Sequence, residues 1–181
     1  MKPPLLSQRL SRLRRMFWLF FLLTIGYMIW VRNYLSPLRS GEIVQLEIAK
    51  TVSKAQFIIQ DWKANGKYEQ GMKSTSIAYL FMALYTVAIV LGCRFVSVCT
   101  GNEILIKGGR LFAWMILLAT VCDVVENIVL SRTLSGDISQ GNVLIAYNLA
   151  RIKFSIVIVC VLFMVACALY WIMAQFSKEK K

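Results

Sequence analysis

An apolar run that carries two acids and an amide constrains this chain more than any other feature of its sequence. The run covers residues 111–131 and is long enough for a membrane-spanning helix, yet it contains Asp123, Glu126 and Asn127. These three side chains share one face of a helix, because residues three and four positions apart are neighbours there. Charged groups are costly in hydrocarbon, so we expect this face to be turned towards other helices.

Three further apolar runs bring the number of predicted spans to four. Hydrophobic residues make up 58% of the 181 residues, which is too apolar for a soluble domain of this size. We therefore predict an all-α, polytopic membrane protein whose four transmembrane helices form one antiparallel bundle. The predicted spans are residues 16–35, 76–93, 111–131 and 150–175, joined by connectors 36–75, 94–110 and 132–149.

The longest predicted connector contains two patterned stretches. Glu42 to Ala49 alternates between apolar and polar residues, which predicts a strand. Apolar residues then recur at helical spacing, which predicts an amphipathic helix over about 52–65, with Thr51 as its N-cap and Gly66 after its end. We interpret this helix either as a cover lying on the bundle or the lipid surface, or as a lid over the acidic face.

The distribution of basic residues predicts the orientation of the spans. Lys and Arg outnumber Asp and Glu by 21 to 9, which gives a net charge of +12. These residues lie mainly beside the apolar runs, so we expect anionic lipid headgroups as partners at the cytoplasmic ends, and no nucleic acid. The basic tails, residues 1–15 and 176–181, favour an inner or plasma membrane protein with both termini in the cytoplasm.

The end of the first apolar run bears on whether that run is retained. It closes with Trp30, Arg32 and Tyr34, and no small-residue cleavage site follows it. These residues are typical of a membrane interface. A retained first span is therefore favoured over a secretory signal peptide or an organelle-targeting presequence.

The candidate binding site combines the acidic face with polar residues of the other spans. The fourth span descends from the boundary to which the third rises, so Lys153 lies at a depth similar to that of Glu126 and is expected to pair with it. Tyr79 and Thr86 share a face of the second span, and Arg32 approaches the same level from the first. The predicted binding residues are Asp123, Glu126, Asn127, Lys153, Tyr79, Thr86 and Arg32.

The residue types present restrict the chemistry. The sequence has no histidine, no nucleotide-binding or nucleophile motif, and no metal-ligand spacing among its five cysteines, so we predict no cofactor, no metal and no catalytic residue. The acidic face is then either a polar clasp between helices or a site for a lipid headgroup, an amine or a cation. Both interpretations indicate a non-enzymatic accessory subunit of a larger membrane complex, or a small-ligand binder. The alternatives are a proton- or cation-coupled transporter acting as a homo-oligomer, and a membrane-embedded lipid-modifying enzyme.

Two stretches resemble a loosely defined group of small four-helix bacterial membrane proteins. One is Leu46-Glu47-Ile48-Ala49-Lys50-Thr51 followed by an amphipathic helix ending in Trp62, and the other is Asp123-x-x-Glu126-Asn127 in the third span. The resemblance covers about residues 42–172 and implies a bacterial inner membrane, but no activity is known for the group. The second stretch is also similar to the Asp-x-Glu-Asn-Ile element of glutathione- and eicosanoid-metabolising membrane enzymes, although its acids are one residue further apart and the preceding arginines are missing.

Overall fold

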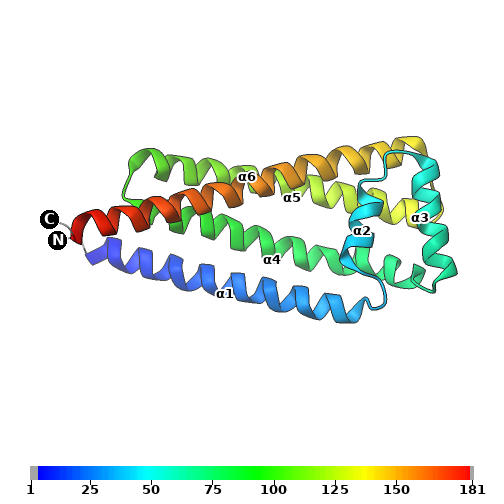
Figure 1. Ribbon diagram of the computed structural model, residues 1–181, viewed down its shortest axis with the longest axis horizontal. Coiled ribbons are helices and arrows are strands. Elements are labelled where there is room, and N and C mark those ends of the chain that lie inside the picture. The colour runs from blue at the N-terminus through cyan, green and yellow to red at the C-terminus, as the bar shows by residue number, and fades with distance from the viewer. Residues whose placement is uncertain (1–3, 180–181) are drawn as a thin grey trace. The chain divides into compact units, whose positions relative to one another are not determined.

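A computed structural model describes residues 4–179, and within this range every regular element is a helix (Figure 1). The elements are α1 (Pro4–Tyr34), α2 (Ser40–Glu47), α3 (Val52–Ala64), α4 (Tyr68–Thr100), α5 (Glu103–Leu134) and α6 (Gln140–Glu179). The helices α1, α4, α5 and α6 are long and apolar enough to cross a membrane. The predicted all-α fold class with four spans is therefore confirmed. Lys2, Lys180 and Lys181 of the predicted basic tails lie outside the described residues.

The described chain divides into two compact units, and each long helix contributes to both. The terminal unit contains the chain up to Thr24, Leu84–Leu118, and the chain from Ser155 onward. The second unit contains Ile25–Ala83 and Ala119–Phe154. We call it the cover unit, because it includes α2 and α3, which together we call the cover.

Close helix packing in the terminal unit depends on a glycine. A Cβ atom on Gly109 would lie 2.7 Å from the carbonyl oxygen of Cys93 and 2.1 Å from Oγ of Ser97, so only glycine permits this approach of α5 to α4. The rings of Phe112 and Phe163 stack with centroids 4.3 Å apart and join α5 to α6. In lipid the hydrophobic effect does not drive helices together, so close van der Waals packing of small and aromatic side chains stabilises these contacts.

The long helices extend beyond the predicted spans. Helix α4 begins at Tyr68 rather than near residue 76, and the predicted connector 94–110 contracts to a turn at Gly101 and Asn102. Gly101 has a φ of +67°, and Oδ1 of Asn102 accepts a hydrogen bond from the backbone N–H of Ile104 at 2.9 Å. Capping, rather than loss of hydrophobicity, therefore decides where these helices end.

The predicted strand over Glu42–Ala49 is wrong, because the structure has helix α2 there. Oε2 of Glu42 accepts a hydrogen bond from the backbone N–H of Arg39 at 2.8 Å, as the third residue of a capping box does. Leu46 is 4% exposed whereas Ile48 is 37% exposed, so these two residues do not share a face as an alternating strand requires. Periods of 2 and 3.6 are hard to separate in eight residues, and the capping interaction favours the helix.

The predicted amphipathic helix is confirmed as α3. Oγ1 of Thr51 accepts a hydrogen bond from the backbone N–H of Lys54 at 3.3 Å. Gly66, which follows the C-cap, has a φ of +66°, a backbone conformation that favours glycine. Both ends of α3 are thus fixed by the residues expected from the sequence.

Replacing Thr51 with alanine is expected to lower the free energy of unfolding by about 1 kcal/mol, since it removes the N-cap acceptor. The measurement is the thermal or denaturant unfolding midpoint of the purified protein in detergent. Ser53→Ala is the matched control, because Ser53 is an exposed residue of the same first turn. An equal loss in both variants would contradict a capping role for Thr51.

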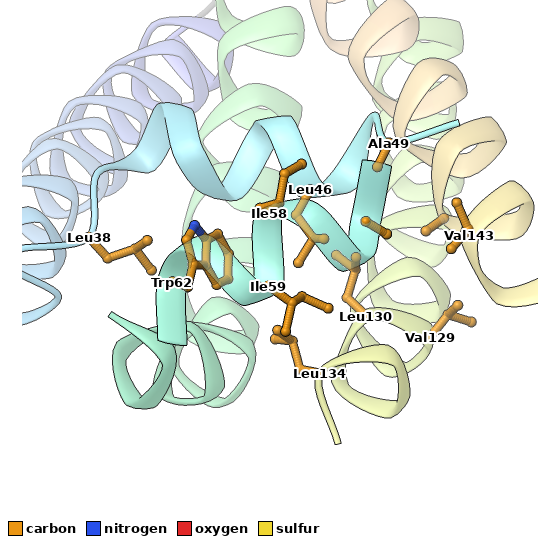
Figure 2. Packing of buried hydrophobic residues seen from close by; sticks show 12 residues of the cluster. Leu38, Leu46, Ala49, Ile58, Ile59, Trp62, Val129, Leu130, Leu134 and Val143 are labelled. Carbon is orange, nitrogen blue, oxygen red and sulfur yellow. The ribbon is translucent and has the colours of Figure 1, made fainter. Parts of the chain in front are cut away.

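Apolar side chains fasten the cover to the ends of the long helices in the cover unit. Figure 2 shows Leu46, Ile59 and Trp62 of the cover together with Leu130 and Leu134 of α5. The buried cluster consists of Leu38, Leu46, Ala49, Ala55, Ile58, Ile59, Trp62, Val129, Leu130, Leu134, Val143 and Ala146. The cover is therefore part of the core of this unit rather than a separate surface helix.

Candidate functional site

A single lysine is surrounded by three carboxyl groups in the cover unit. Nζ of Lys153 lies 2.7 Å from Oδ1 of Asp123, 2.9 Å from Oε2 of Glu126 and 3.4 Å from Oε2 of Glu47. Helix α5 supplies Asp123 and Glu126, α6 supplies Lys153, and α2 supplies Glu47 from its last position. We call these four residues the acidic cluster. The predicted pairing of Glu126 with Lys153 is present.

The acidic cluster is buried. The exposed side-chain fractions are 12% for Asp123, 0% for Glu126, 8% for Lys153 and 14% for Glu47. Among the described residues, Oε1 of Glu126 has no hydrogen-bond partner. A buried carboxyl oxygen without a hydrogen-bond partner is costly, so Glu126 contributes less stability than a fully hydrogen-bonded ion pair would.

Glu47 is the member of the cluster that sequence reasoning missed. The strand interpretation placed Glu47 on a polar face directed away from Leu46. In helix α2, Ile43, Leu46 and Glu47 are at positions i, i+3 and i+4 and face the same side. Glu42 was the available sequence signal, because a capping residue there indicates a helix. A helix places Glu47 on the same inward side as Leu46.

The environment of Glu47 favours its neutral form. Burial raises the pKa of Glu47 above its ordinary value of 4.5, and the negative charge of Asp123 raises it further, against the opposing charge of Lys153. Glu47 also ends α2, where the negative pole of the helix dipole disfavours a carboxylate.

The remaining predicted site residues separate into two groups. Nδ2 of Asn127 donates a hydrogen bond to the backbone carbonyl of Thr75 at 2.6 Å, which joins α5 to α4 beside the cluster. Arg32 is exposed and Tyr79 is 44% exposed, and neither takes part in the cluster's ion pairs within residues 4–179. Thr86 is buried but belongs to the terminal unit.

An open groove with charged side chains along its lining lies beside α2. It has a volume of about 760 Å³ and is lined by Pro37, Arg39, Gly41, Glu42, Gln45 and Lys67. Nζ of Lys67 lies 2.6 Å from Oε1 of Glu42, and this ion pair ties α2 to the segment between α3 and α4. A Cβ atom on Gly41 would meet no atom within 4 Å, so the groove is accessible from solvent at this point.

The ion pair across the groove is expected to depend on pH. Burial alone would raise the pKa of Glu42, but the hydrogen bond and charge of Lys67 and the N–H of Arg39 outweigh it, so this pKa lies below 4.5. Stability from a group with a lowered pKa is present above its unfolded-state pKa and is lost as the pH falls through the folded-state value. Acidification should therefore weaken the attachment of α2 by up to about 1 kcal/mol, the magnitude of a partly exposed pair.

The check is amide hydrogen exchange in α2, corrected for the intrinsic pH dependence of exchange. Glu42→Gln should exchange faster than the wild type at neutral pH and should lose the acid-dependent increase. Glu69→Gln changes an exposed acid at the start of α4 and should leave the increase unchanged. If acidification increases amide exchange in α2 equally in Glu42→Gln and in the wild type, another acid causes the pH dependence.

Comparison with known proteins adds no further assignment, because no protein-family model, no curated protein and no solved structure matches this chain.

Proposed function

We propose that this chain is a non-enzymatic accessory subunit of a bacterial inner-membrane complex, and that its cover is the part that its partner recognises. The observation that carries the proposal is the attachment of the cover to two spanning helices through Lys153 and its three acids. A cover held by both an apolar core and a buried ion network is a rigid extramembrane platform. Rigid surfaces bind partners at a lower entropic cost than flexible loops do.

The groove beside α2 is the surface of this platform that we propose contacts the partner or a small ligand. Arg39, Glu42 and Lys67 place both signs of charge around it. Such a rim suits a polar contact whose register is set by charge complementarity. A lipid headgroup that carries charges is the small ligand that the same groove would accept.

The proposed orientation has both termini in the cytoplasm and the cover outside. The density of basic residues in the two tails supports it, as does the resemblance of two stretches to small bacterial membrane proteins. Single cysteines at Ser40, Glu103 and Ser139, in a background without the native cysteines, should be labelled from outside only at Ser40 and Ser139. External labelling at Glu103 would reverse the orientation.

Copurification from native membranes in mild detergent tests the accessory role. A partner protein should copurify with the wild type and with Lys50→Met, which removes an exposed charge beside α3. Arg39→Gln alters the proposed contact surface without touching the acidic cluster, and it should reduce recovery of the partner. Recovery of the wild type as a lone monomer would reject the proposal.

Proton-coupled transport by a homo-oligomer is the second candidate function. Buried acids on a spanning helix favour it, because such residues often belong to proton pathways. The complete burial of Glu126 argues against a permanently open path. A pH-dependent flux in proteoliposomes that disappears in Asp123→Asn would promote transport over the accessory role, and absence of flux would reject it.

A further inference from the structure

The acidic cluster contains more negative charge than its lysine neutralises. With all three carboxyl groups ionised, the four side chains carry a net charge of −2, and within residues 4–179 Glu47 and Glu126 both form their ion pair with the same lysine, Lys153. The cluster is almost completely buried, so water screens this charge poorly. A further positive charge shared by Glu47 and Glu126 would therefore stabilise the folded protein.

A metal ion does not fit as the source of that charge. The ammonium group of Lys153 already occupies the centre of the three carboxyl groups, at 2.7–3.4 Å from one oxygen of each. No group of three acids or cysteines among the described residues has an arrangement that would hold a metal. The remaining small cation that a closed carboxyl cluster accommodates is a proton.

Two of the three acids are placed to share that proton. Asp123 makes the shortest contact with Lys153, at 2.7 Å from its Nζ, so these two opposite charges offset each other. Within the described residues, Oε2 of Glu47, which lies 3.4 Å from Nζ of Lys153, and Oε1 of Glu126 are buried without a hydrogen-bond partner. The two carboxyl groups are close enough to form a hydrogen bond with each other once one is protonated. Two carboxyl groups in contact with one another cannot both remain ionised without cost, so such pairs hold one proton between them.

We propose that the acidic cluster is a binding site for one exchangeable proton, held between Glu47 of α2 and Glu126 of α5. This site goes beyond the accessory function, which requires only that the cover be attached. Loss of the proton leaves two adjacent carboxylates, one on α2 of the cover and one on α5, that repel each other. Proton occupancy therefore controls how firmly α2 is attached, with Asp123 and Lys153 as the other charged groups that face the pair.

The direction of the pH effect follows from the raised pKa of Glu47. An acid whose pKa is raised on folding contributes stability that is present below its unfolded-state pKa and is lost as the pH rises through the folded-state value. Exchange of α2 amides should therefore increase as the pH rises through the ionisation of this pair. This direction is opposite to that expected for the ion pair of Glu42 with Lys67, so the two effects are separable.

Infrared spectroscopy of the full chain in lipid nanodiscs tests the site directly. During a titration from about pH 4 to about pH 9, which brackets the ordinary carboxyl range, the wild type should retain one protonated-carboxyl band after exposed acids have ionised. That band should then disappear in a single step. Glu47→Gln and Glu126→Gln should each abolish the retained band, because the remaining acid is stabilised as a carboxylate by Lys153, and Glu69→Gln should keep it.

Two further measurements keep the result interpretable. Circular dichroism and the exchange of α4 amides establish whether each variant is folded. The wild-type titration tests the proton site even if a variant does not fold. Replacing sodium by a large organic cation should leave the band unchanged. A folded wild type without the retained band, a band that survives both glutamine variants, or a band displaced by sodium would each overturn the proton site, whereas the accessory role is decided separately by copurification.

Discussion

Lys153→Met is expected to be the most damaging single substitution in this protein. It removes the cation that pairs with three buried acids, and breaking a buried pair by removing one partner costs about 3–5 kcal/mol. The unfolding midpoint in detergent and the yield of monodisperse protein measure the effect. Lys50→Met, at an exposed lysine, should change neither quantity appreciably.

The double variant Glu126→Gln with Lys153→Met distinguishes ion pairing from simple loss of packing. It removes the completely buried carboxylate along with its partner, so it should recover part of the lost stability, and the coupling between the two sites should exceed about 0.5 kcal/mol. Glu69→Gln combined with Lys153→Met should recover nothing. Additive losses for Glu126 and Lys153 would show that the short distance between them contributes no interaction energy.

Trp62→Ala is expected to have the second largest effect, with a loss of about 3–5 kcal/mol, because a large buried aromatic side chain leaves a cavity when it is truncated. Trp62 is 1% exposed and is the largest of the fully buried side chains. The measurement is denaturant unfolding together with amide exchange in α3. Phe57→Ala removes an aromatic side chain that is 71% exposed on the same helix, and it should have little effect in detergent.

The contact between Trp62 and Gly71 provides a second test of the same packing. A Cβ atom on Gly71 would lie 2.6 Å from the Trp62 ring, so Gly71→Ala should destabilise the cover unit by overpacking, which typically costs about 1–3 kcal/mol. In a Trp62→Leu background, the space vacated by the ring should make Gly71→Ala much less damaging. A Gly71→Ala penalty that is equal in both backgrounds would contradict this contact.

The four spans and the pairing of Glu126 with Lys153 could be predicted because each follows from a strong local rule. Long apolar runs predict spans, and two residues at matched depth on consecutive antiparallel helices are expected to meet. Thr51 and Gly66 were identifiable for a similar reason, since caps and turn glycines act on their immediate neighbours.

The failures arose where short segments or tertiary contacts decide the structure. The residues of α2 satisfy both strand and helix periods over eight positions, and the error concealed Glu47, whose burial depends on contacts with α5 and α6. The long helices extend beyond the predicted spans because hydropathy reports the extent of an apolar stretch rather than the extent of the helix. Arg32 and Tyr79 were assigned by approximate depth, but their rotation about the helix axis leaves both exposed.

The position of Lys153 in the chain has a consequence for biosynthesis. Glu47, Asp123 and Glu126 all leave the ribosome before Lys153 does, so α5 enters the membrane without the cation that later accompanies its acids. Protonation lowers the cost of inserting such carboxyl groups, and the cover has no ionic attachment to α5 at this stage. Synthesis of α6 then delivers the lysine, and the ionic attachment of α2 to the spans is completed only after the last helix has arrived.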